Sequence, residues 1–377
     1  MLRTNLNNKI LPFWKGLIDR KRGGFYGYVD FDLNVDKDAV KGCILNSRIL
    51  WFFANAGERE YADHAYRFLT ERCIDRENLG VYWSVSADGT PFDTTKHCYN
   101  QAFAIYALSA YYELSGDADA LKLAYELFEV IEQKCADPNG YGEAYDLNWN
   151  KAGNEKLSEN GVEAARTMNT LLHVFEAYSG LYKADKKPEV AAKMRKILDI
   201  FKTKVFNPAL DRQEVFFDAD YNSLLDLQSY GHDIEASWLI DWGTDLLQDA
   251  ALSKEIGDLT TRLAVNVYNK AYHKQSLWNE CERGIENKTR IWWVQAEAAL
   301  GFFNLYEKTR DDKYLTATRE LLGYIEDKLT DKRDGSEWFW DLDDNDRPTS
   351  RNPIAEPWKC PYHNGRMVFE LLRRKFE

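Results

Sequence analysis

The feature of this sequence that most constrains its fold is an internal repeat of about sixty residues. Six short aromatic stretches flanked by Gly or Asp recur along the chain, and their first residues are 56, 60, 75, 62 and 61 positions apart. They cover residues 24–28, 80–83, 140–143, 215–218, 277–280 and 338–341. Periods of this length are typical of helical arrays and closed toroids, in which each repeat is one supersecondary unit.

Two stretches with helical periodicity lie between successive aromatic stretches. Apolar residues recur at i, i+3, i+4 and i+7, as in Leu121, Ala124, Tyr125 and Phe128, which indicates a helix with one buried face. The predicted helices cover residues 9–18, 44–55, 60–73, 97–114, 118–134, 165–182, 189–205, 232–247, 250–272, 291–309, 312–329 and 362–375.

Twelve helices in six hairpins predict an all-α fold, an (α/α)6 barrel of six inner and six outer helices with short β-hairpins and aromatic loops at one end. We expect the first and last helices to pair and close the ring. An open α-solenoid is the alternative, but open solenoids need polar terminal repeats, and both terminal helices here are strongly apolar. Since no Pro- or Ser-rich linker interrupts the chain, residues 1–377 are expected to form a single domain.

The composition narrows the classes of partner. The chain carries 61 acidic and 49 basic residues, a net charge of −12, which argues against nucleic acid. No window of about 18 apolar residues predicts a membrane span, and the N-terminal residues do not resemble a secretory signal. The six cysteines are scattered without a CxxC pair, so we expect free thiols in the cytoplasm. We expect a monomer or a weak homodimer.

Unusual polar and aromatic residues occur near the start of every predicted inner helix. Because all six inner helices begin at the same end of a barrel, we expect these side chains to converge on one pocket. They are Asn46, Arg48, His97, Tyr99, Asn100, Arg166, Asn169, His173, His232, Glu235, Arg290, Trp292, Trp293, Gln295, Glu297, Trp358, His363, Asn364 and Arg366. Four of the six histidines are among them. The aromatic content of 14% fits a sugar ligand, because aromatic faces stack on sugar rings.

Two pairs within this set have a spacing that places both side chains on one helix face. Asn169 and His173 are four residues apart, and His232 and Glu235 are three apart. A carboxylate beside an imidazole raises the pKa of the imidazole and can fix its tautomer. We therefore expect Glu235 to orient His232.

Common motifs for metals and nucleotides are missing from the sequence. There is no HxxxH, HExxH or complete EF-hand loop, and no GxGxxG, Walker loop or GxSxG. We predict neither a metal site nor a bound cofactor.

Five segments of the chain resemble a known family. Residues 229–238 (SYGHDIEASW) and 291–297 (IWWVQAE) resemble motifs of the N-acylglucosamine 2-epimerase superfamily. Residues 358–367 (WKCPYHNGRM), 41–48 (KGCILNSR) and 167–170 (TMNT) resemble its cellobiose 2-epimerase branch. The likeness covers nearly the whole chain and departs from the expected pattern after residue 367, where Val-Phe replaces Cys-Leu.

The resemblance implies an (α/α)6 barrel that needs no cofactor and reversibly epimerises C2 of the reducing-end glucose in β-1,4-linked disaccharides, such as cellobiose or lactose. By motif, His232 and His363 match the acid/base pair. The positions that match substrate contacts are Arg48, Asn169, His173 and Glu235, and those that match sugar-stacking tryptophans are Trp292 and Trp358.

The chemistry of this reaction suits the histidines. After the sugar ring opens, a base removes the C2 proton next to the C1 carbonyl, and a proton returns from the opposite face. Histidine can act in both directions because its unperturbed pKa is about 6.5. Arg48 is expected to stabilise the negative charge that develops on oxygen.

Three other functions stay open at this point. An aldose–ketose isomerase, or a 2-epimerase of monosaccharides or N-acylglucosamine, would use the same scaffold. A glycoside hydrolase would use two carboxylates, for which Glu235 and Glu297 are present. A sugar-binding protein would use the tryptophans without catalysis.

Overall fold

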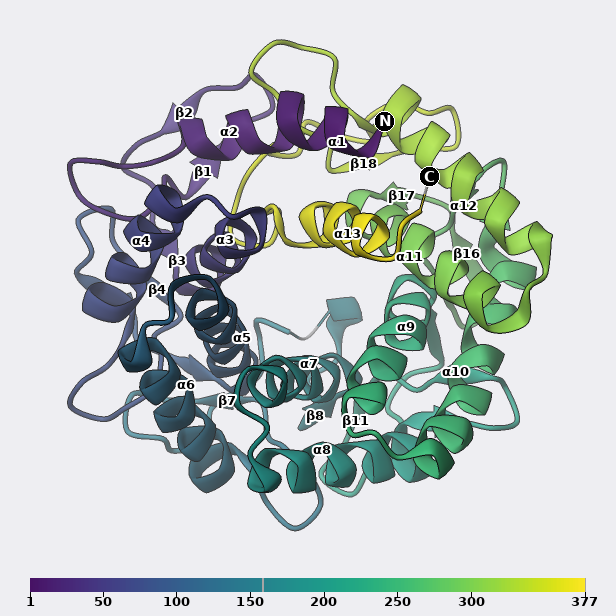
Figure 1. Ribbon diagram of the computed structural model, residues 1–377, viewed down its shortest axis with the longest axis horizontal. Coiled ribbons are helices and arrows are strands. Elements are labelled where there is room, and N and C mark those ends of the chain that lie inside the picture. The colour runs from purple at the N-terminus through teal and green to yellow at the C-terminus, as the bar shows by residue number, and fades with distance from the viewer. Residues whose placement is uncertain (158, 377) are drawn as a thin grey trace.

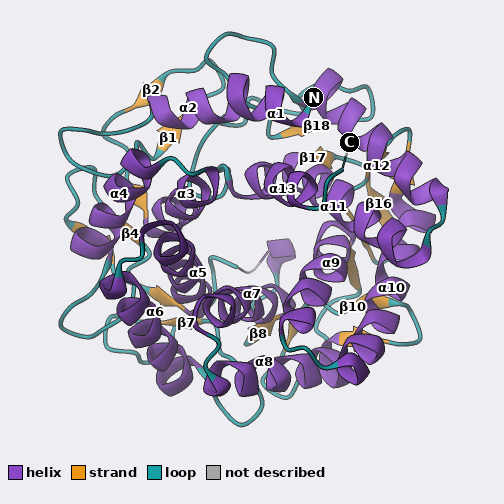
Figure 2. Ribbon diagram, in the orientation of Figure 1, coloured by secondary structure: helices purple, strands orange, loops and turns teal. Residues whose placement is uncertain are grey.

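The computed structural model describes residues 1–157 and 159–376, and its helices form two concentric rings (Figure 1; Figure 2). Each inner helix packs on the next, and the last one packs on both its predecessor and the first, which closes the inner ring. The inner helices are α3 (Cys43–Ala56), α5 (Cys98–Ser115), α7 (Met168–Asp185), α9 (Tyr230–Leu246), α11 (Trp292–Thr309) and α13 (Tyr362–Arg373).

The outer ring surrounds the inner one, and each outer helix packs on an inner partner. The outer helices are α1 (Leu2–Asn5) with α2 (Leu11–Gly16), α4 (Arg59–Phe68), α6 (Ala118–Val130), α8 (Pro188–Ile200), α10 (Ala250–Ala271) and α12 (Asp312–Tyr324). The π-helical segments Leu6–Ile10, Leu69–Cys73, Ile131–Cys135, Phe201–Val205 and Ile325–Leu329 join or extend them. The predicted (α/α)6 barrel is confirmed, and the N-terminal helical segment pairs with α13 as expected.

Short antiparallel strands link neighbouring repeats at the end of the barrel where the inner helices begin. The residues just before an inner helix pair with the aromatic region of the next repeat along the chain. These pairs are β3 (Lys41–Gly42) with β4 (Ser84–Val85), β6 (Lys96–His97) with β7 (Ala144–Tyr145), β8 (Arg166–Thr167) with β11 (Phe216–Phe217), β12 (Leu227–Ser229) with β15 (Glu280–Glu282), and β17 (Arg290–Ile291) with β18 (Asp341–Leu342).

The remaining strands form small hairpins. They are β1 (Tyr28–Val29) with β2 (Val35–Asp36), β5 (Pro91–Asp93) with β4, β9 (Phe206–Asn207) with β10 (Arg212–Gln213), β13 (Tyr272–His273) with β14 (Ser276–Leu277), and β16 (Ile285–Asn287) with β15. A short 3-10 turn covers Glu159–Gly161.

Two predicted helix starts are wrong for identifiable reasons. The first helix begins at Leu2 and not at residue 9, because Leu2 and Leu6 are buried in the core and extend its apolar face. The helix predicted from residue 165 begins at Met168, because Arg166 and Thr167 are held in the ladder with β11.

Buried ion pairs fasten several inner helices to the preceding loops. In each pair a lysine just before the helix contacts an acid in a loop, and both side chains are at most 2% exposed. The pairs are Lys41 with Asp19 at 2.9 Å, Lys96 with Asp75 at 2.7 Å, and Lys359 with Glu337 at 2.7 Å. Such pairs fix the point at which each helix begins, and with it the direction of its first side chains.

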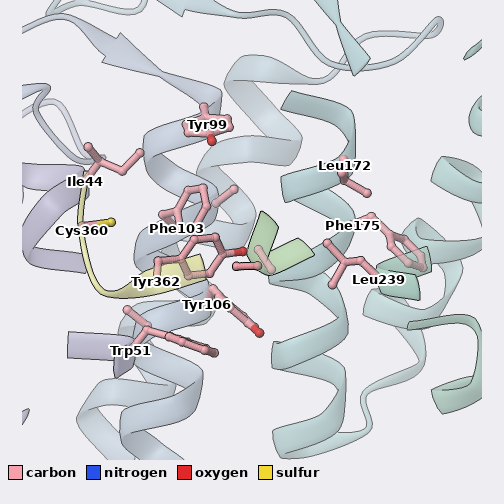
Figure 3. Close-up of a cluster of buried hydrophobic side chains, with 14 of the residues drawn as sticks. Ile44, Trp51, Tyr99, Phe103, Tyr106, Leu172, Phe175, Leu239, Cys360 and Tyr362 are labelled. Carbon is pink, nitrogen blue, oxygen red and sulfur yellow. The ribbon is translucent and has the colours of Figure 1, made fainter. Parts of the chain in front are cut away.

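Aromatic side chains fill the space between the inner helices. Trp51 of α3 stacks on Tyr106 of α5 with ring centroids 5.4 Å apart. Tyr362 of α13 meets Phe103 edge-on at 5.1 Å and Trp51 at 5.3 Å, and Figure 3 shows these four rings together. Much of the aromatic content therefore serves packing.

Two further findings concern the whole chain. In its described part, no helix combines the length and the apolar character that crossing a membrane demands. The six cysteines are free thiols, and five of them are buried.

Close helix packing at Gly301 gives a test of this architecture. A Cβ atom at Gly301 of α11 would lie 2.4 Å from Cγ1 and 2.9 Å from the backbone oxygen of Ile234 in α9. Gly323 in α12 is a matched control, since a Cβ there would meet nothing within 4 Å. We expect Gly301→Ala to lower the free energy of unfolding by about 1–3 kcal/mol through overpacking, and Gly323→Ala to raise it by about 0.5–1 kcal/mol.

Urea unfolding of the two variants and the parent measures both effects. Equal stability of the Gly301→Ala variant and the parent would contradict the close approach of α9 and α11.

Candidate active site

One cavity of about 210 Å³ lies where the inner helices begin. All eight side chains that the sequence assigns to catalysis or substrate binding line it. They are Arg48, Asn169, His173, His232, Glu235, Trp292, Trp358 and His363. They come from five of the six inner helices and from the segment that leads into α13.

Eight further side chains complete the lining: Tyr99, Leu157, Ser229, Asn279, Glu280, Ile291, Trp293 and Trp340. Asn279, Glu280 and Trp340 belong to the recurring aromatic stretches, so the repeat itself carries a signal for them. Leu157 lies in a loop without periodicity, and the sequence offers no signal for it.

Several of the polar residues expected in the pocket form structural hydrogen bonds elsewhere. Asn46 accepts a hydrogen bond from the Phe25 amide at 3.2 Å, and Gln295 accepts one from the Leu277 amide at 2.8 Å. Each holds an aromatic stretch in place. Helix residues two apart, such as Asn46 and Arg48, face different sides, so only part of each polar group reaches the cavity.

Other polar residues just before or early in the inner helices form structural contacts. Arg166 pairs with Asp137 and Arg290 with Asp344, while Asn364 donates to Glu337. His97, with Asn100, is fully buried outside the cavity lining. The expectation that all these groups converge on one pocket is therefore wrong in part.

His232 lies in the first turn of α9, and its Nδ1 is 2.7 Å from the hydroxyl oxygen of Ser229. Glu235 instead pairs with Arg366, so the prediction that Glu235 orients His232 is wrong. Burial, together with His173 and His363, lowers the pKa of His232 to about 3, in place of the expected rise. The imidazole is neutral near pH 7, and because Ser229 engages Nδ1, Nε2 is the ring nitrogen left for a ligand in the cavity.

His363 lies in the first turn of α13 and is held by a carboxylate. Its Nδ1 is 2.7 Å from Glu297 Oε1 and 3.9 Å from Glu235 Oε1. Burial, with the charges of Arg366 and Arg48, lowers the pKa of His363 well below its usual value. The ring of Trp293 lies against both catalytic candidates, 5.4 Å from His363 and 4.8 Å from His232.

The third imidazole of the cavity, His173, also has a carboxylate partner. Its Nδ1 is 2.8 Å from Glu176 Oε2, one helical turn further along α7. Tyr362 donates its hydroxyl to the same carboxylate. Although burial opposes it, the charges of Arg366 and His173 lower the pKa of Glu176 to about 2.

Arg366 connects these groups behind the cavity wall. Its guanidinium contacts Glu176, Glu235 and Glu297, and the side chains of all four are at most 1% exposed. Burial and the charge of Glu297 raise the pKa of Glu235 to about 7. Burial likewise raises the pKa of Glu297.

A metal ion has one candidate site among the described residues. Donor atoms of Glu235, Glu297 and His363 lie within 4.8 Å of one another. The guanidinium of Arg366 already lies between the two carboxylates, so the protein itself supplies the positive charge that this donor set attracts.

Arg48 is a buried guanidinium without an acidic partner. It donates to the Tyr99 hydroxyl at 2.9 Å and lies 4.1 Å above the ring of Phe103. Within residues 1–157 and 159–376, no carboxylate lies within 4.0 Å of its nitrogens. Its charge is therefore available to an anionic group in the cavity.

Four of the lining residues also keep buried polar atoms without a protein partner. These atoms are Arg48 Nε, Asn169 Oδ1, Glu235 Oε2 and Trp292 Nε1. Buried polar groups normally have partners, because leaving one unsatisfied costs about 1–3 kcal/mol. Their gathering around one cavity indicates a ligand with many hydroxyl groups.

Tryptophan side chains form the apolar part of the wall. Trp292 packs on Trp340 with centroids 4.9 Å apart, and Trp358 meets Trp83 at 5.7 Å. Aromatic faces next to polar atoms suit a sugar ligand, because a sugar ring has apolar faces and polar edges.

Comparison with known proteins agrees with this chemistry. The model of the N-acylglucosamine 2-epimerase (GlcNAc 2-epimerase) family matches residues 24–364. A cellobiose 2-epimerase from Eubacterium cellulosolvens is 47% identical over 395 residues, which cover 99% of this chain and 97% of the relative.

Two solved structures are similar over almost their full length. A sugar epimerase from a ruminal bacterium has a TM-score of 0.98 at 45% identity and covers 100% of this chain and 98% of its own. A cellobiose 2-epimerase from Bacillus thermoamylovorans B4167 has a TM-score of 0.95 at 42% identity, with 99% and 98% covered. The chain therefore belongs to the N-acylglucosamine 2-epimerase family and is a carbohydrate epimerase, a type of isomerase.

Proposed function

We propose that this epimerase reversibly inverts C2 of the reducing-end glucose in β-1,4-linked disaccharides, converting cellobiose to glucosyl-mannose and lactose to epilactose. The observation that carries the proposal is a pair of imidazoles, from α9 and α13, that border one cavity with their Nδ1 atoms engaged elsewhere. The similarity to proteins named cellobiose 2-epimerase supports the choice of substrate.

The reaction starts with the open-chain sugar, because the cyclic hemiacetal has no carbonyl to acidify the C2 proton. One imidazole takes the C2 proton through Nε2, and the electron pair moves to the C1 oxygen to give an enediolate. The other imidazole returns a proton to the opposite face of C2. His232 and His363 fill these two roles, and Arg48 stabilises the enediolate oxygen.

The other lining residues hold the sugar in place. Asn169, His173 and Glu235 supply hydrogen-bonding groups, and Trp292 and Trp358 supply faces on which sugar rings stack. The chemistry consists of proton transfers alone, so it requires no cofactor.

We further propose that the whole chain acts as a single catalytic domain in the cytoplasm. Packing of the N-terminal helical segment on α13 supports one folding unit, and six free thiols fit a reducing compartment. The expectation of a monomer or weak homodimer stays part of the proposal.

Solvent exchange tests the reaction class. In deuterated water with cellobiose, we expect NMR to show glucosyl-mannose and deuterium at C2 of the reducing-end residue. A ketose as the main product would indicate an isomerase. Free glucose would indicate a hydrolase, and binding without exchange at C2 would indicate a sugar-binding protein.

Removal of either proposed acid/base group should abolish most activity. General acid–base groups contribute about 10²–10⁴-fold, so we expect His232→Ala and His363→Ala to lower kcat by that factor. His273→Ala is the control, because His273 is exposed outside the cavity, and it should retain the parent's kcat. Near-parental turnover by both cavity variants would refute the assignment.

The role of Arg48 predicts a loss of rate without unfolding. Donors that stabilise an oxyanion contribute about 10²–10³-fold to kcat, so Arg48→Met should lose that factor on cellobiose. Since Arg48 has no acidic partner, the substitution leaves no carboxylate uncompensated, and thermal unfolding should stay cooperative. An unchanged kcat in the folded variant would remove Arg48 from the mechanism.

A further inference from the structure

The wall behind the cavity holds more negative than positive charge. Three carboxylates, Glu176, Glu235 and Glu297, meet the single guanidinium of Arg366, and all four side chains are buried. The one guanidinium therefore leaves an excess of negative charge if all three carboxylates are ionised. Carboxylates that share a buried site cannot all be ionised, since like charges raise the pKa of one of them.

Neighbouring helices place few other charges near this cluster. Arg48 lies on α3, α5 contributes the Tyr99 and Tyr106 phenols, and α7 contributes His173. α9 contributes His232, which interacts with His363, and α13 adds the Tyr362 phenol beside Arg366. Arg48 is the one further permanent positive charge in this set, and it has no contact with the three carboxylates.

The two imidazoles of the proposed acid/base pair have different partners. Ser229, beside His232, has a hydroxyl that both donates and accepts, so it tolerates either tautomer of His232. Glu297, beside His363, also accepts from the Trp238 indole at 2.9 Å and from Arg366 at 2.7 Å. Burial raises the pKa of Glu297 and lowers that of His363, so Glu297 shares a proton with His363 Nδ1, and the neutral His363 ring carries its own proton at Nε2.

We propose that Arg366 is a positioning residue which acts through Glu297 and Glu235. It keeps one exchangeable proton on the His363 side of the cavity. In the resting enzyme His232 is therefore the base and His363 the acid. This inference rests on the proposed function and assigns a division of labour within it.

The proton movements balance over one turnover. The C2–H bond breaks as His232 Nε2 takes the proton and the electron pair moves to the C1 oxygen. With the shared proton between Glu297 and Nδ1 of a neutral His363, the Nε2–H bond of His363 breaks as a new C2–H bond forms on the opposite face, and Nδ1 takes the shared proton. His363 is left neutral with Nδ1–H on Glu297. His232 then gives its proton to water, and the cluster takes one back.

Rigid packing keeps Arg366 in position. Its guanidinium lies 4.3 Å from the ring of Tyr362 and 4.9 Å from that of Trp238, and Tyr362 is itself fixed in the aromatic core (Figure 3). Burial raises the pKa of Glu235 to about 7 together with Glu297, which fits a proton retained by the cluster near neutral pH.

The test is the pH dependence of kcat on cellobiose in four variants. Loss of the shared proton should define the basic limb of the parent's profile. An opposite charge close by lowers a pKa by about 1–3 units, so Arg366→Met should move that limb about 1–3 units to higher pH. Arg366→Lys keeps the charge and should leave the limb in place while kcat falls, because lysine cannot bridge the carboxylates as a planar fork does.

The other two variants complete the design. Glu235→Gln removes one negative charge and should move the basic limb to lower pH. Arg374→Met is the matched control, since Arg374 lies on the same segment and faces the same Trp238 ring but pairs with Glu307; it should keep the parent's profile. If Arg366→Met does not fold, the unchanged limb expected for Arg366→Lys and the lowered limb expected for Glu235→Gln still test the inference.

If Arg366 had only a structural role, both arginine variants would lower kcat without moving the basic limb of the pH profile. That result would overturn the inference. A rise of the limb in Glu235→Gln would overturn it as well.

Nitrogen NMR of ¹⁵N-labelled histidine in the resting enzyme separates this inference from the proposed function. The His363 signal should sense a titration near neutral pH that moves down in Glu235→Gln. That shift without epimerase activity would reject the function alone. Epimerase activity without any shift would reject the inference alone.

Discussion

The arrangement of the cavity depends on the buried contacts of Arg366. This guanidinium comes from α13, and the three carboxylates that it holds come from α7, α9 and α11. Two of those carboxylates in turn hold imidazoles that line the cavity. The contacts of the last helix that close the ring therefore also bring the side chains of the site together.

Such a cluster is not a simple source of stability. Removing charges from water costs several kcal/mol per ion, and breaking a buried pair costs about 3–5 kcal/mol because a charge is left uncompensated. The cluster instead fixes geometry, because each carboxylate has a defined partner, and two of the carboxylates orient the imidazoles of His173 and His363. The neighbouring Arg48 differs, because its guanidinium lines the cavity and has no acidic partner among the described residues.

The repeat in the sequence was sufficient for the architecture but not for the contacts inside it. Six aromatic stretches near sixty residues apart determine six helix pairs, and the start of each inner helix marks one end of the barrel. Spacing alone failed for Glu235, because its partner Arg366 lies 131 residues away and outcompetes His232, three residues away. Leu157 could not be found either, since it sits in a loop without any period.

The central claim is that C2 of an open-chain sugar lies between His232 and His363. A crystal structure with a reduced, open-chain β-1,4-linked disaccharide tests this most directly. The account predicts the Nε2 atoms of the two histidines on opposite faces of C2, with Arg48 at the oxygen on C1. Both imidazoles on one face of C2, or a sugar bound with C2 outside their reach, would contradict it.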